Sequence, residues 1–226
     1  MKKEVETYFK HLKALGVEQV EVEKPSPKPH PQKAGIGTLA NLAAEVSKCA
    51  RCRLHKTRTQ TVFGSGDPKA RLMFVGEAPG ADEDEQGLPF VGRAGKLLTN
   101  MIEAERALNI PRSSVYIANV LKCRPPGNRP PEQDEVAQCE RYLKEQIALI
   151  KPSFICALGT HAAQTLLKTN EPIGRLRGRW HEYDGIPLIA TYHPSYLLRS
   201  PQYKNEAWKD LLMLKEALDG KAGRPL

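Results

Sequence analysis

The residues of this chain that could do chemistry are concentrated in loops rich in glycine, proline and charge. The loops are GEAPGADEDEQGLPFVG at 76–92, KCRPPGNRPP at 122–131 and YHPSYLLR at 192–199. In or beside them stand Glu77, Glu83, Phe90, Asn119 and His193. An aromatic face, an amide and an imidazole suit a planar, hydrogen-bonding heterocycle such as a nucleobase. The carboxylates can serve acid, base or electrostatic roles beside it.

Each of these residues also has a simpler explanation. Phe90 in an apolar segment is more often a core residue, Asn119 can cap a loop, and His193 before a proline can be structural. The acidic run at 82–85 is read from composition as a solvated stretch, since charge runs usually face water. Taken together in one basic protein, the residues favour a base-reading pocket.

Four of the five cysteines have a spacing typical of metal ligands. Cys49 and Cys52 form a C-x-x-C turn, and Cys123 and Cys139 follow with fifteen residues between them. By spacing alone this set permits a tetrahedral zinc site or an iron–sulfur cluster. Cys156 lies inside an apolar run and is predicted to be an ordinary core residue.

The charge balance indicates a polyanionic partner. Lys and Arg number 34 against 26 Asp and Glu, a net charge of +8 with a pI near 9.2, which favours nucleic acid. The sequence contains no apolar run of membrane-spanning length, and its first residues lack the apolar core of a signal peptide. A cytoplasmic protein, associated with the nucleoid through DNA, is expected.

The elements that must position these loops alternate between strands and helices. Apolar, β-branched runs predict strands at 72–75, 114–121, 153–158 and 187–191, with helices at 38–48, 94–108, 132–150, 160–167 and 202–218. This order predicts an α/β fold: a three-layer αβα arrangement around a central, mostly parallel four-stranded sheet. The loops at the carboxyl ends of such strands converge on one crevice. Residues 174–184 are irregular and suit a short hairpin.

The chain is expected to consist of one domain with an extension at each end. Residues 1–36 contain a short amphipathic helix at 2–15 and a proline-rich linker. The globular domain is predicted over 37–219, and 220–226 form a flexible tail.

The long motifs GEAPGADEDEQGLPFVGRAGKLL, NVLKCRPPGNRPP and HPSYLLR resemble the three motif regions of the family 4 uracil-DNA glycosylases. The similarity runs from about residue 37 to 218 in the expected order. It implies hydrolysis of the N-glycosidic bond of uracil in DNA, which leaves an abasic site. It also decides the metal question in favour of a [4Fe–4S] cluster held by Cys49, Cys52, Cys123 and Cys139.

The resemblance also implies roles for individual residues. Phe90 would stack on a flipped uracil, Asn119 would pair with its N3–H and O4, and His193 would donate to its O2. Where the wider superfamily has a water-handling aspartate this chain has Ala78, so the resemblance shifts that task to Glu83. The segment from Glu77 to Gly80 would line the pocket and offer backbone N–H groups.

Contacts to DNA are expected from two of the loops. Leu197 and Leu198 would wedge into the duplex, with simple helix-end packing as the alternative. Arg124, Arg129 and Arg199 would hold phosphates. The protein is expected to act as a monomer on single- or double-stranded DNA.

Three other functions are weighed against a uracil-specific hydrolase. A non-catalytic uracil-DNA-binding module is disfavoured by the intact Glu83, Asn119 and His193. A covalent trap is disfavoured because the region CRPPGNRPP holds no histidine. A glycosylase that also acts on other bases stays open.

Overall fold

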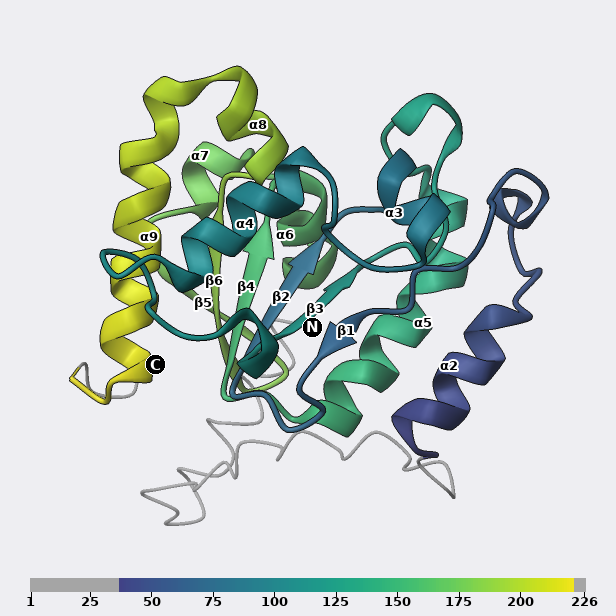
Figure 1. Cartoon of the computed structure of the whole chain (residues 1–226), viewed down its shortest axis with the longest axis horizontal. Helices are drawn as coiled ribbons and strands as arrows, with labels where there is room; N and C mark the ends of the chain where they lie inside the picture. The colour runs from purple at the N-terminus through teal and green to yellow at the C-terminus, as the bar shows by residue number, and fades with distance from the viewer. Residues whose placement is uncertain (1–36, 222–226) are drawn as a thin grey trace, which may run out of the picture. The chain divides into compact units, whose positions relative to one another are not determined.

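The computed structural model describes residues 37–221 and shows a six-stranded sheet with helices on both faces (Figure 1). The strands are β1 Ser65–Gly66, β2 Leu72–Gly76, β3 Tyr116–Asn119, β4 Phe154–Leu158, β5 Trp180–Tyr183 and β6 Ile186–Thr191. They are arranged in the order β1-β3-β2-β4-β6-β5. Neighbours among β3, β2, β4 and β6 pair in parallel, whereas β1 and β5 pair antiparallel at the edges.

The predicted α/β class is confirmed, but the strand count of four is corrected to six. The four predicted strands are the central parallel ones. The extra strands lie at the edges: β1 is only two residues long, and β5 forms with β6 the hairpin suspected around 174–184. A two-residue strand leaves no periodicity to detect, because alternation needs several residues.

Five helices occupy the expected parts of the sequence, and three short ones are additions. They are α2 Leu39–Ser47, α3 Ala81–Gln86, α4 Arg93–Glu103, α5 Gln133–Ile150, α6 Thr160–Leu167, α7 Ile173–Leu176, α8 Pro194–Arg199 and α9 Lys204–Leu218. The helix expected over 94–108 ends at Glu103. The short helices α3, α7 and α8 were not predicted, and α3 lies inside the acidic loop.

Side-chain alternation along the buried strands divides the core between the two faces of the sheet. In β2, Met73 and Val75 join the cluster that includes α2, α5 and α6, whereas Leu72 and Phe74 join the cluster of α4 and α9. Each such side chain stabilises the fold by roughly 1.5–3 kcal/mol when fully buried. The result is the predicted three-layer arrangement (Figure 1).

The parallel register brings the strand ends level at one edge of the sheet. Gly76 at the end of β2 pairs with Asn119 at the end of β3, and Leu158 of β4 pairs with Thr191 of β6. The loops that follow therefore start side by side, as expected for the carboxyl edge of a parallel sheet.

Some expectations fall on residues that the structure does not describe. The helix at 2–15, the linker up to 36 and residues 222–226 lie outside the described part of the chain. Within 37–221, none of the helices has the length and apolar character to span a membrane.

Candidate active site

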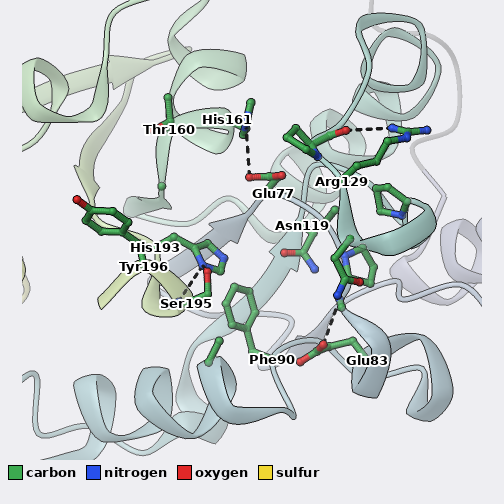
Figure 2. A pocket seen from close by; sticks show the side chains of 18 of the residues that line it. Glu77, Glu83, Phe90, Asn119, Arg129, Thr160, His161, His193, Ser195 and Tyr196 are labelled. Carbon is green, nitrogen blue, oxygen red and sulfur yellow. Dashed lines mark hydrogen bonds and ion pairs between the residues drawn. The ribbon is translucent and has the colours of Figure 1, made fainter. Parts of the chain in front are cut away.

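A cavity of about 620 Å³ opens at the carboxyl edge of the sheet (Figure 2). Most of the predicted site residues line it: Glu77, Ala78, Gly80, Glu83, Phe90, Asn119, Arg129, His193 and Arg199. Arg124, Leu197 and Leu198 are not among the lining residues. The predicted convergence of the loops therefore occurs, with two leucines and one arginine outside it.

Asn119 presents an unsatisfied hydrogen-bond acceptor in this cavity. Its side chain is 1% exposed, and within residues 37–221 its Oδ1 has no hydrogen-bond partner. A Cβ at Gly76 would approach this oxygen to 2.3 Å and the ring of Phe90 to 2.6 Å, so only glycine leaves room for both. A buried acceptor without a donor destabilises a protein by about 1–3 kcal/mol. The site is thus built to receive a donor from a ligand.

Phe90 is buried, as the simpler explanation for it predicts, and it also lines the cavity. Its ring centroid lies 5.6 Å from that of His193, with 32° between the planes. Both rings and the amide of Asn119 point toward the same space (Figure 2). A flat ligand can therefore contact a π face and polar groups at once.

The hydrogen bonds of His193 indicate which ring nitrogen carries its proton. Nδ1 accepts from the backbone N–H of Ser195 at 3.1 Å and lies 2.8 Å from the Ser195 hydroxyl oxygen. With Nδ1 as acceptor, the neutral ring carries its proton on Nε2. Burial, helped by the charge of Arg199, lowers the pKa of His193 to about 4. At neutral pH the ring is an uncharged donor.

The carboxylate of Glu83 holds the glycine-rich loop together. One oxygen accepts from the backbone N–H groups of Val91 and Gly92 at 2.8 and 3.0 Å, and the other accepts from Gly80 at 3.1 Å. It also lines the cavity (Figure 2). These contacts explain α3: Glu83 at its third position caps the helix start.

The acidic run is only partly solvated, which corrects the reading from composition. Asp82 and Glu85 are exposed. Asp84 is 3% exposed and accepts the backbone N–H of Thr59 with both oxygens, at 3.1 and 3.0 Å. This buried carboxylate is hydrogen-bonded to the backbone of a distant segment, a pattern that a charge run in a sequence cannot reveal.

Glu77 follows β2 and faces His161 across 4.0 Å (Figure 2). Burial raises its pKa, and the nearby His161 opposes that rise. His161, with Gly159 and Thr160, lines the cavity and was not predicted. A signal existed, because these residues follow the end of β4 and so leave the same edge of the sheet as the other loops.

The residues expected to contact DNA differ in their exposure to solvent. Arg199 is exposed, but Leu197 is 2% exposed and packs in the core with α4 and α9. A wedge role for Leu197 therefore requires α8 to shift, whereas Leu198 is half-buried. Arg129 is paired with Glu135, and Arg124 donates to Asn128 at 2.7 Å.

The four predicted metal-ligating cysteines surround a second, small pocket between α2, α5 and the loop after β3. The guanidinium of Arg58 donates to Cys123 Sγ at 3.1 Å, and the backbone N–H of Lys122 donates to Cys139 Sγ at 3.2 Å. Burial raises the pKa of Cys52 and Cys123, and that of Cys139 to about 12. Bound metal reverses this effect, because it coordinates the thiolate.

The four cysteines form a ligand set whose residue type fits an iron–sulfur cluster and also zinc. Among residues 37–221, no three His, Cys, Asp or Glu side chains come close enough to share one metal ion. Four cysteines at one small pocket, with a cationic donor and an N–H donor to sulfur, match the ligand chemistry of iron–sulfur proteins. Cys156 is fully buried in the other core cluster, as predicted.

Lys122 connects the cysteine site to the backbone of Asn119. Lys122 is 1% exposed, and its ammonium donates to the backbone carbonyl of Asn119 at 2.7 Å and to Gln146 Oε1 at 2.5 Å. Since its own backbone N–H donates to the sulfur of Cys139, Lys122 ties the loop after β3 both to the carbonyl of Asn119 and to Cys139. Such a buried lysine cannot be anticipated from a basic loop in the sequence.

Comparison with known proteins agrees with this geometry. The model of the uracil DNA glycosylase superfamily matches residues 63–212, which include the four central strands and the cavity loops. The type-4 uracil-DNA glycosylase of Saccharolobus solfataricus is 44% identical over 194 residues, 82% of this chain and 89% of that protein. That of Archaeoglobus fulgidus is 43% identical over 187 residues, 79% of this chain and 92% of the relative. That of Thermotoga maritima is 45% identical over 161 residues, 70% and 82% of the two chains. This chain belongs to the uracil-DNA glycosylase superfamily.

Proposed function

We propose that the chain is a uracil-DNA glycosylase that removes uracil from DNA by base excision and leaves an abasic site. The observation that carries this proposal is the unpartnered, buried Oδ1 of Asn119 in the cavity. Uracil offers the N3–H donor that this oxygen lacks. The match to type-4 uracil-DNA glycosylases over most of the chain supports the same reaction.

In the proposed reaction the uracil leaves the base stack and enters the cavity, because its glycosidic bond is out of reach inside the duplex. Phe90 stacks on the ring and Asn119 pairs with N3–H and O4. The N1–C1′ bond breaks with its electron pair on uracil, and Nε2–H of His193 donates to O2 as negative charge develops there. Water bonds to C1′, and its released proton balances the charge on the departing base.

The carboxylates have an electrostatic part in this proposal. A sugar that loses its base becomes oxocarbenium-like, and a negative neighbour stabilises it. Glu83 is the proposed group that orients water and offsets this charge, with Glu77 lining the same cavity. Because Glu83 also holds three backbone N–H groups, its carboxylate is fixed in place before the substrate arrives.

Glu83→Gln is expected to lower the single-turnover excision rate by roughly 10²- to 10⁴-fold, the range of a lost acid–base group. Binding of uracil-DNA should stay intact or improve, since one negative charge near the phosphates is gone. The matched control is Glu85→Gln on the same short helix, whose side chain is exposed. An unchanged rate in Glu83→Gln would move the water-handling role to Asp82, Asp84 or backbone groups.

The function itself is tested by incubating the protein with a uracil-containing oligonucleotide and a cytosine-containing control, followed by alkaline cleavage. Cleavage at the uracil position alone supports the glycosylase. A protein that binds uracil-DNA and releases no base would instead be the non-catalytic module. Oligonucleotides carrying hypoxanthine or mispaired thymine measure any wider range of bases.

The cysteine site is proposed to hold a [4Fe–4S] cluster through Cys49, Cys52, Cys123 and Cys139. The bound group would supply no step of the hydrolysis, and would instead link α2, α5 and the loop after Asn119. Arg58 and the Lys122 N–H would stabilise the negative sulfurs. The exposed basic residues around Cys49 and Cys52 would lie near DNA phosphates.

Purified protein is therefore expected to be yellow-brown, with about four iron atoms per chain in a cluster of this type. Alanine at any of the four cysteine positions should bleach the visible absorbance and lower the iron content. Cys156→Ala, at a buried position away from that pocket, should keep both. A colourless protein with one zinc per chain would contradict the assignment.

The remaining parts of the proposal concern partners and place of action. The substrate would be single- or double-stranded DNA held by Arg199, Arg124, Arg129 and the tip of α8. The protein would act as a monomer in the compartment that contains the DNA, at the nucleoid of the cytoplasm.

A further inference from the structure

Arg112 lies just before β3, outside the lining of the cavity, yet it binds the backbone of the segment that carries Phe90. One terminal nitrogen donates to the carbonyl oxygens of Pro89 and Phe90 at 3.0 and 3.1 Å. The other donates to Thr99 Oγ1 of α4 at 3.0 Å. The guanidinium thus joins the base-stacking segment to a rigid helix.

Phe90 needs such support because its backbone is strained. Its φ is +54°, in the left-handed region that a bulky side chain rarely adopts. The two carbonyls bound by Arg112 lie on either side of the φ and ψ bonds of Phe90, so one cation fixes both dihedrals. Strained residues persist where surrounding structure over-determines them, and they concentrate at functional sites.

The opposite side of the same segment is held by groups already described. Glu83 accepts the backbone N–H groups of Val91 and Gly92, which directly follow Phe90. At Gly95 a Cβ would lie 1.8 Å from the Phe90 carbonyl oxygen, so this carbonyl rests against the backbone of α4. Arg112 on the carbonyls and Glu83 on the N–H groups therefore hold the segment 89–92 from both sides.

We propose that Arg112 is a positioning residue for the reaction: it holds the Phe90 ring at the angle needed to stack on the flipped base. This proposal rests on the proposed function. A purely structural role would tie the start of β3 to α4 without acting through Phe90. The two roles differ in whether the effect of losing Arg112 requires the Phe90 ring.

A double-mutant cycle separates these roles, with single-turnover excision of uracil from one oligonucleotide as the readout. Arg112→Met is expected to lower the rate by roughly 10- to 100-fold, the loss typical of a slightly misplaced contact. Phe90→Ala is expected to lower it by at least about 10-fold, the lower range for a lost base–aromatic stack. The double variant should be within about 3-fold of Phe90→Ala alone, because effects through one group do not add.

Two further variants make the test independent of folding. Arg112→Lys keeps the charge and can reach one carbonyl but not the planar fork, so it should fall between wild type and Arg112→Met. Arg106→Met removes an exposed arginine six positions earlier in the sequence and should match wild type. Visible absorbance and the unfolding temperature report whether each variant retains its cluster and fold.

The proposal is overturned if the rate losses of Arg112→Met and Phe90→Ala multiply in the double variant. It is also overturned if a folded Arg112→Met protein excises uracil at the wild-type rate. If Arg112→Met does not fold, Arg112→Lys takes its place in the cycle. A rate loss of Arg112→Lys that multiplies with that of Phe90→Ala would then overturn the proposal. These outcomes leave the proposed function standing, provided that wild type releases uracil. Failure of wild type to release uracil is the separate result that removes the function itself.

Discussion

Replacing Asn119 by alanine is expected to remove most uracil excision, by about 10²- to 10⁴-fold in single-turnover rate. The amide would accept from uracil N3–H through Oδ1 and donate to O4, and both contacts lie in a cavity where Asn119 is 1% exposed. Alanine leaves two polar groups of the base unpaired in a desolvated site. The measurement is the rate of base release under enzyme excess.

Asn119→Asp adds a test of base choice. A carboxylate can accept from the amino group of cytosine but cannot donate to O4 of uracil, so it should weaken uracil excision and relax the barrier against cytosine. Asn100→Ala, an exposed asparagine on α4, is the matched control and should behave as wild type. Both Asn119 variants should keep the visible absorbance, since the ligand cysteines are untouched. Near-normal uracil excision by Asn119→Ala would show that the amide is not the reader.

The second large effect is expected at His193. Its Nε2–H is the donor placed where negative charge develops, and loss of one such donor lowers the rate by roughly 10²- to 10³-fold. His193→Ala should show this loss, whereas His193→Gln, which can still donate from an amide, should recover part of it. The excision rates of the two variants are compared in single turnover, so that binding and product release do not contribute. Equal rates for both variants and wild type would exclude the donor role.

The pH dependence follows from the direction of the His193 shift. Its pKa falls from 6.5 to about 4 in the folded protein, so the ring stays neutral from the physiological range down to that value. The excision rate should show no inflection near pH 6.5 that belongs to His193. Between about pH 4 and 6.5 the unfolded chain binds the extra proton, so this residue makes stability rise with pH across that window. His193→Gln should remove that part of the slope in thermal unfolding.

The central sheet could be predicted from the sequence because its four parallel strands are short continuous apolar runs. Of the edge strands, β1 could not be predicted because it is two residues long, and β5 was anticipated only as part of a short hairpin at 174–184. The short helix α3 was also missed. Its residues are mostly charged, and what stabilises it is the capping by Glu83 and the burial of Asp84 against Thr59. The contact of Asp84 depends on a segment that lies 25 residues earlier in the sequence.

The types of residue in the site were predictable, but the way they are held was not. Phe90, Asn119 and His193 follow from loops at strand ends, and the structure brings them together in one cavity. Arg112 and Lys122 act on carbonyls, through contacts that leave no pattern in the sequence. The burial of Leu197 depends likewise on how α8 packs against α4 and α9. Motifs therefore indicate the chemistry, whereas tertiary contacts fix its geometry.

The most direct test of the account is a crystal structure of the protein with uracil in the cavity, as product or in a DNA complex. The predicted result is a uracil ring stacked on Phe90, with N3 within hydrogen-bond distance of Asn119 Oδ1, about 2.7–3.2 Å, and O2 facing Nε2 of His193. Uracil bound elsewhere, or bound here with Oδ1 of Asn119 still unpaired, would contradict it.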